Sequence, residues 1–278
     1  MSIVAGAHQP PPAATGTSIV HPHGLTQALW LVRRSVRGTI RRPVALAPAF
    51  IFPLFFAALS SSSFSRATEL PGFPAVDSFL QFMLAATIVQ GVTFGSIQAG
   101  SDMAIDIEQG FFDRLVASPS SRAAVVVGHL GGAFVIGSLQ ALVFCLVLIP
   151  FGATVEGGLI GVALLSLGGG LVATAFGGVM VAMGIKTGSS EAVQGFFPLL
   201  FVLLFFSSAF FPRETMDGWF RWVADHNPMS FLVEGLRGIV VEGVSVRRVL
   251  EALGIPLLAT GVGVTLSLLA LRGRLAAR

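Results

Sequence analysis

DIEQGFFDRLVASPSSR, residues 106–122, is a charged segment between two long apolar runs. Read as a helix over residues 106–117, it places its apolar side chains on one side. Its charged side chains lie around the remainder: Asp106, Glu108, Asp113 and Arg114. We expect such a helix to lie on a membrane surface or to dock a partner. A solvated loop is the alternative, because runs of charge are usually just solvated.

The composition is that of an integral membrane protein. Of 278 residues, 54% are hydrophobic and 11% are charged, whereas a soluble domain has about 25% charged residues. Residues 1–24 have no apolar period and are expected to form a disordered cytoplasmic tail. They do not resemble a signal peptide, because the arginines begin at Arg33 and the apolar run follows Pro43.

Residues 25–42 predict an amphipathic interfacial helix. Apolar residues recur at three- and four-residue steps, and Arg34, Arg37 and Arg41 point the other way. Arginines favour anionic lipid headgroups, and Trp30 suits the headgroup boundary. A helix that packs on a soluble partner is the alternative.

Residues 43–278 are expected to form one all-α membrane domain with six transmembrane helices. A span needs about 20 apolar residues, and six runs reach that length. They are 44–64, 79–100, 123–150, 158–185, 192–211 and 252–271. Small residues at four-residue spacing, such as Gly91 and Gly95, indicate close helix packing rather than a nucleotide loop. With both termini in the cytoplasm, most of the seventeen Lys and Arg residues lie inside, as the positive-inside rule requires.

The segment between the fifth and sixth runs predicts an outer re-entrant helical hairpin over residues 213–240. Its two apolar halves are too short to span, and Asn227-Pro228 is placed to reverse the chain between them. Glu234 and Arg237 are expected to pair with each other or with a partner at the membrane boundary. A lipid-surface hairpin without gating is the alternative. The predicted outer-gate residues are Trp219, Trp222, Asn227, Pro228, Phe231, Glu234 and Arg237.

The sequence has no motif for an energy source of its own. A phosphate-binding loop ends in Gly-Lys-Ser/Thr, but the single lysine, Lys186, follows Ile185. The five histidines lack metal-ligand spacing, and no serine has a nucleophile-elbow pattern. Asp102 and His129 are expected to cap, pair or be hydrated at helix ends. We therefore expect a transport subunit without catalytic residues, cofactor, metal or nucleic-acid partner.

Two motifs resemble a known family. EQGFFDRLVASPSSR, residues 108–122, is similar to the segment between spans two and three of ABC-2 type exporter permeases, in the branch named for daunorubicin resistance. SSAFFP at 207–212 and NPMSF at 227–231 resemble that branch's signature after span five. The order of elements agrees from about residue 25 to the C-terminus. The family usually has Thr where Phe111 stands and Glu where Asp113 stands.

The resemblance implies an exporter made of several subunits. A helix at residues 106–117 would insert into a cleft of an ABC ATPase subunit, which would bind ATP and magnesium, and the hairpin would cap the outer side. Two ATPase copies and a second permease, identical or homologous, would complete the complex in the lipid of a bacterial cell membrane. The implied coupling residues are Asp106, Glu108, Gly110, Phe111, Asp113, Arg114 and Leu115.

The expected substrates are hydrophobic or amphipathic compounds, drugs or lipids, moved outward. Helices one and five of two permease copies would face each other across a path lined by Phe55, Phe56, Phe201 and Phe205. Aromatic faces suit flat apolar or cationic molecules, but phenylalanines that only pack against lipid or other helices are the alternative. A lipid or lipid-linked glycan exporter is another alternative. The chain has no tyrosine, which weakens the resemblance to carbohydrate exporters that line their path with tyrosine and tryptophan. A membrane anchor or sensor without transport is the alternative of another class.

Overall fold

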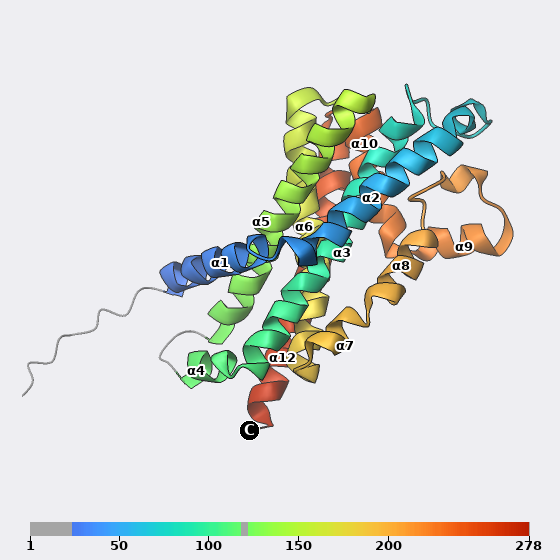
Figure 1. Ribbon diagram of the computed structural model, residues 1–278. Helices are drawn as coiled ribbons and strands as arrows, with labels where there is room; N and C mark the ends of the chain where they lie inside the picture. The colour runs from blue at the N-terminus through green and yellow to red at the C-terminus, as the bar shows by residue number, and fades with distance from the viewer. Residues whose placement is uncertain (1–23, 118–121, 278) are drawn as a thin grey trace, which may run out of the picture.

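The computed structural model describes residues 24–117 and 122–277, and in this part of the chain the regular structure is entirely helical (Figure 1). The predicted all-α class is therefore confirmed. Five of the described helical stretches are long and apolar enough to cross a membrane. They are α2 (Pro43–Ser63), α3 (Phe79–Glu108), α5 (Arg122–Leu148) with η2 (Ile149–Phe151), α6 (Gly158–Thr187), and α11 (Val246–Val249) continued by η4 (Leu250–Gly254) and α12 (Ile255–Ala276).

The bundle is built around α3 and α6. Nearly all of α3 is buried, although it carries several polar residues, whereas α2 and α12 keep much of their surface exposed. α6 packs against α3, α5 and α12, which lie beside it in Figure 1. Close helix packing depends on glycine: a Cβ at Gly100 of α3 would overlap the backbone of Met180 in α6, and one at Gly178 would overlap Gly263 in α12. The small residues therefore pack helices together, as predicted.

α1 (Gly24–Ile40) covers nearly the whole range predicted for the amphipathic helix. It crosses the bundle instead of running along it (Figure 1) and packs on α5, where Leu31 and Ser35 lie against Gly128 and Gly132. The opposite side of α1 is exposed and carries Trp30 together with arginines. The tail predicted over residues 1–24 lies, up to residue 23, outside the described residues.

The prediction of a single spanning helix over residues 192–211 is wrong. The chain forms α7 (Ser190–Gln194), turns at Gly195 and Phe196, and continues as α8 (Phe197–Phe205). Pro198 lies in the first turn of α8, where its missing N–H costs nothing, but it cannot donate the hydrogen bond that would join α8 to α7. Nine residues of helix reach only about 14 Å. The described residues thus contain five helices of spanning length and one broken apolar segment, and the sixth span stays a prediction.

The chain after α8 passes through η3 (Arg213–Thr215) to α9 (Gly218–His226) and α10 (Pro228–Val241). The helix boundary falls at Asn227-Pro228, the residues predicted to reverse the chain. α10 is mostly buried and packs against α3, while α9 lies at the side of the molecule near the end of α8 (Figure 1). A further short helix, η1 (Ser65–Glu69), follows α2.

Candidate functional site

The charged segment that decides the fold is two helices, so the single helix predicted over residues 106–117 is wrong. Asp106 and Glu108 belong to the last turn of α3, and α4 (Phe111–Ala117) begins after a turn at Gln109-Gly110. Gly110 has a φ of +68°, in the left-handed region that glycine adopts without steric cost. The glycine therefore ends α3 and redirects the chain into α4.

Arg34 of α1 holds this segment to the bundle. Its Nη1 and Nη2 atoms donate to the two carboxylate oxygens of Asp106 at 2.8 and 2.6 Å, and its guanidinium lies 4.0 Å from the ring centroid of Phe111. His129 Nε2 lies 3.4 Å from the same carboxylate. The hydrogen bond to Asp106 raises the pKa of Arg34, so the pair stays ionised. Asp102 is paired in a similar way, with Arg42 at 3.1 Å. Of the alternatives expected for Asp102 and His129, capping, pairing or hydration, the structure shows pairing, although both residues lie within their helices.

The predicted coupling residues therefore differ in how much surface they offer a partner. Asp106 is only 5% exposed and is bound within the chain. Phe111 is half-buried under Arg34, whereas Glu108, Asp113 and Arg114 are exposed. Leu115 lies in α4, but its side chain is outside what the structure describes. Among the described side chains here, a partner can thus reach the exposed charged groups beside the half-buried ring of Phe111.

Glu108, the last residue of α3, connects the turn before α4 to the broken fifth segment. Its exposed carboxylate accepts a hydrogen bond from the backbone N–H of Ser190, the first residue of α7, at 3.0 Å. The first amides of a helix have no partner within the helix, so the carboxylate caps α7. The turn after α3 is consequently bonded directly to the segment that leads into α8. Spacing in the sequence could not reveal this contact, since 82 residues separate its partners.

Three of the four phenylalanines predicted to line a path lie in one aromatic cluster between α2 and α8. The rings of Phe201 and Phe205 stack with centroids 4.3 Å apart, and Phe56 meets Phe205 edge-on at 5.6 Å. Phe52, which was not predicted, joins the cluster through Phe201 at 5.7 Å. Phe55 is 58% exposed and contacts the cluster only through Phe56, at 6.1 Å. The structure thus brings Phe56, Phe201 and Phe205 together, whereas Phe55 lies at the edge of the cluster.

A cavity of about 440 Å³ adjoins this cluster. Phenylalanines dominate its lining and come from separate elements, among them Phe56 of α2, Phe79 of α3, Phe205 of α8 and Phe220 of α9. Ser60, Ser63 and Ser207 supply its polar groups, and no charged side chain lines it. The volume lies within the range of small-molecule pockets, which are mostly apolar with a few placed polar groups. We call it the aromatic cavity.

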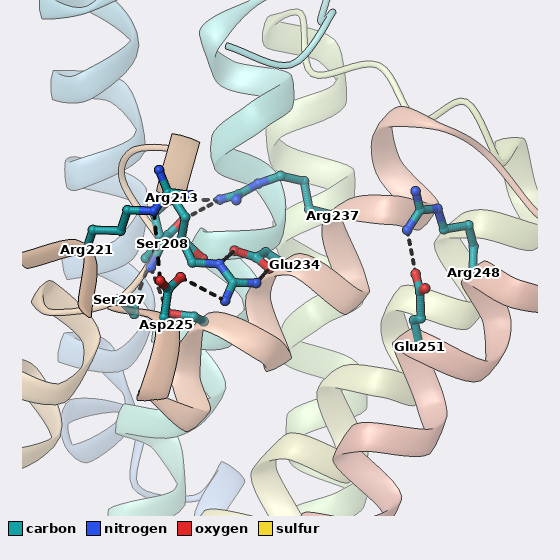
Figure 2. A network of polar contacts seen from close by, with 11 residues as sticks. Ser207, Ser208, Arg213, Arg221, Asp225, Glu234, Arg237, Arg248 and Glu251 are labelled. Carbon is teal, nitrogen blue, oxygen red and sulfur yellow. Dashed lines mark hydrogen bonds and ion pairs between the residues drawn. The ribbon is translucent and has the colours of Figure 1, made fainter. Parts of the chain in front are cut away.

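An ion-pair network links η3, α9 and α10, the part of the chain that includes the cavity-lining residues Met216 and Phe220. Arg213 Nε donates to Glu234 Oε1 at 2.7 Å, and its Nη1 reaches Asp225 Oδ1 at 3.4 Å. Figure 2 shows Arg213 between these two carboxylates, with Arg237 directed elsewhere. Of the two predicted alternatives for Glu234, the structure shows pairing with a partner residue, Arg213, and not with Arg237. Arg213 also lies over the ring of Phe231 at 5.1 Å.

Arg237 instead binds three backbone carbonyls, two of which, those of Ser208 and Ala209, lie outside any helix. Its Nη2 donates to the carbonyls of Ser208 and Ala209, both at 3.0 Å, and its Nε donates to the carbonyl of Phe82 at 3.3 Å. The guanidinium also lies 3.7 Å from the Phe82 ring centroid. Burial lowers the pKa of Arg237 to about 9, which leaves it cationic at neutral pH. The contact with Ser208 is visible in Figure 2.

Asn227 has a related role at the end of α8. Its Nδ2 donates to the carbonyls of Leu203 and Phe206 at 2.6 and 2.9 Å, while its Oδ1 accepts from the N–H of Met229 at 2.9 Å. One amide thus caps the C-terminus of α8 and the N-terminus of α10. Of the other predicted gate residues, Trp219 and Trp222 are exposed. α10 is mostly buried whereas these tryptophans are not, and gating stays a prediction.

Comparison with known families shows which family the chain belongs to. The profile of ABC-2 type transporters matches residues 26–241, from α1 to the last residue of α10. The chain belongs to the ABC-2 type transporter family. This permease is 30% identical over 244 residues to the daunorubicin resistance ABC transporter permease protein DrrB1 of Streptomyces coeruleorubidus, covering 85% of this chain and 80% of that one. The predicted family is confirmed.

More distant relatives extend the comparison. The permease is 27% identical over 220 residues to the putative transport permease ycf38 of Cyanophora paradoxa, covering 74% of this chain and 71% of that one. It is 26% identical over 136 residues to the ABC transporter G family member 20 of Dictyostelium discoideum, covering 49% of this chain and 18% of that one. These organisms are diverse, so the bacterial origin of this chain stays a prediction.

Proposed function

We propose that this permease is the membrane subunit of an exporter that moves hydrophobic or amphipathic compounds outward, powered by a separate ATPase subunit. The aromatic cavity carries this proposal. Its volume of about 440 Å³ and its phenylalanine lining suit an apolar body, which gains about 25 cal/mol for each Å² of apolar surface removed from water. The name of the Streptomyces relative, a daunorubicin resistance permease, supports the same class of compound.

Docking of the ATPase is assigned to α4 and the turn before it. Asp113 and Arg114 offer exposed charges, and Glu108 caps α7, so a displacement of α4 can be passed to α7 and α8 through one hydrogen bond. α8 carries Phe201 and Phe205 of the aromatic cluster. Movement of α8 relative to α2 would separate the Phe56–Phe205 contact and open the cavity on that side. Two permeases and two ATPase subunits, with the α4 end in the cytoplasm, complete the proposed complex.

The proposal is tested by exchanging one ring of the cavity. In the complex with its ATPase, a set of chemically different apolar compounds should stimulate ATP turnover. Phe205→Ala removes the ring that both stacks on Phe201 and lines the cavity, so apparent affinity should fall about five- to tenfold for the flat compounds. Phe151→Ala, at an exposed phenylalanine of η2, is the matched control and should leave stimulation unchanged.

Two outcomes would count against the proposal. Equal stimulation in Phe205→Ala and Phe151→Ala would show that the phenylalanines only pack. An ATPase whose turnover is indifferent to every apolar compound, although it co-purifies with the permease, would favour an anchor or sensor.

A further inference from the structure

Three serines line the aromatic cavity, and their hydroxyls differ in how they are bonded. The hydroxyl of Ser207 donates to the carbonyl of Leu204 at 2.5 Å and accepts from the N–H of Ala209 at 3.2 Å. Ser63 is exposed. Ser60 is only 6% exposed, and among the described residues its hydroxyl has no hydrogen-bond partner. Ser60 is therefore the nearly buried polar group of this lining that has no bond within the chain.

The hydroxyl of Ser60 is also open to the cavity. Other unpartnered hydroxyls of the described chain, such as those of Thr93, Ser101 and Ser208, are enclosed by protein atoms and have essentially no accessible surface. Ser60 is not one of these, and it lines the cavity. A ligand in the cavity can therefore reach this hydroxyl. Because nearly buried hydroxyls are usually hydrogen-bonded, an acceptor on the ligand would supply the bond that the chain does not.

Aromatic rings lie on both sides of Ser60 along the chain. Phe56 and Phe64 lie four residues before and after it, and all three line the same cavity. Each ring belongs to a group of its own: Phe56 lies 5.9 Å from Phe210, and Phe64 lies 5.3 Å from Phe211, between ring centroids. A flat molecule that lies against both groups therefore brings the middle of its edge to the Ser60 hydroxyl.

We propose that Ser60 is a specificity-determining residue of the aromatic cavity. Its hydroxyl donates to an acceptor, such as a ring carbonyl, at the middle of a flat aromatic compound whose rings lie against the phenylalanines. The permease thereby prefers such compounds to hydrocarbons of the same shape. No charged side chain lines the cavity, so the acceptor is an uncharged one. This inference rests on the proposed export function and names the class of substrate within it.

The test compares two ligands that differ only in the acceptor. Fluorenone and fluorene have the same fused-ring skeleton, and only fluorenone has a carbonyl, at the middle of one edge. Each is tritiated, and its binding to the purified full-length permease in phosphatidylcholine nanodiscs is measured by scintillation proximity, with the signal of empty nanodiscs subtracted. We expect saturable binding of both, about three- to tenfold tighter for fluorenone, which is the range of one net hydrogen bond.

Variants assign the difference to Ser60. Ser60→Ala should reduce the affinity for fluorenone to that for fluorene and leave fluorene unchanged. Ser62→Ala is the matched control, because Ser62 is a serine of the same helix that is exposed and does not line the cavity. It should bind both ligands as the unmodified permease does. Phe205→Ala, which removes a ring of the lining, should weaken both ligands alike and so place them in this cavity.

Several results would overturn the role of Ser60. These are equal affinities for the two ligands, a Ser60→Ala variant that still prefers fluorenone, a Ser62→Ala variant that loses the preference, or no saturable binding. Equal affinities that Phe205→Ala weakens alike would refute this role and leave export of apolar compounds in place. A preference lost only in Ser60→Ala, in a permease whose complex transports nothing with ATP, would instead refute the proposed function and leave the binding preference in place.

Discussion

Single polar side chains support the irregular backbone between α8 and α10. Non-helical backbone at membrane depth must be satisfied within the protein, because lipid offers no hydrogen bonds. Asn227 caps the carbonyls of Leu203 and Phe206, and Arg237 binds those of Ser208 and Ala209. These two residues let the chain leave α8 after nine residues and still remain packed.

Arg237→Met tests this role. The substitution keeps an apolar stem of similar length but leaves the carbonyls of Ser208 and Ala209, which lie outside any helix, without this donor. We expect a loss of about 2–4 kcal/mol in stability, since each buried acceptor left unpaired costs about 1–3 kcal/mol before relaxation. The apparent unfolding temperature in detergent should fall by several degrees.

The matched control is Arg247→Met. Arg247 pairs with Glu251, but its side chain is 80% exposed, so its loss should change stability by less than about 1 kcal/mol. Equal unfolding temperatures for the two variants would show that the guanidinium of Arg237 is dispensable to the fold.

The sequence predicted only part of the structure between α8 and α10. Asn227-Pro228 correctly marked the boundary between two helices, because proline begins a helix readily and asparagine caps one. The three-residue spacing of Glu234 and Arg237 allowed a pair between them or with another residue, and it could not identify that residue. Arg213, 21 residues before Glu234, takes that carboxylate, and the carbonyls that Arg237 binds come from segments 28 to 155 residues away. Local spacing cannot reveal competition from so far along the chain.

Among the elements, α7 joins the α4 segment to the aromatic cluster. Glu108→Ala removes the acceptor of the Ser190 N–H and should loosen the first turn of α7. Hydrogen–deuterium exchange of the Ser190–Gln194 amides should become about three- to tenfold faster, corresponding to the loss of one capping bond.

Glu191→Ala provides the comparison for this effect. Glu191 is an exposed carboxylate in the same turn and is not the acceptor of the Ser190 N–H. Its substitution should leave exchange of these amides nearly unchanged. If these amides exchanged no faster in Glu108→Ala than in Glu191→Ala, the hydrogen bond between Glu108 and Ser190 would not stabilise α7.

Apolar length predicted the elements well where one helix buries its own backbone groups. α2, α3, α5, α6 and α12 follow the apolar runs, and glycines lie where helices approach closely. The run at 192–211 had the length and composition of a span, but the chain turns at Gly195 and Phe196, and Pro198 lacks the N–H that a continuous helix needs. The helix predicted over residues 106–117 failed for a similar reason, since the left-handed Gly110 divides it.

At the scale of the whole molecule, contacts join the charged turn to the aromatic cavity. Glu108, at the end of α3 and next to α4, binds the first residue of α7. α8 follows α7 and carries Phe201 and Phe205, of which Phe205 lines the aromatic cavity. Family membership makes the chain a transport permease, and the proposed ATP-driven export of an apolar substrate would act through these contacts.

The most direct test is uptake of an amphipathic fluorescent dye into inverted membrane vesicles that contain the permease and its ATPase subunit. Export from the cytoplasm becomes uptake in this orientation. If the permease exports apolar compounds, dye uptake requires both ATP and the permease, and it is slower in Phe205→Ala but not in Phe151→Ala. Dye uptake that is the same with and without the permease, in vesicles where the ATPase is bound and active, would contradict export by this permease.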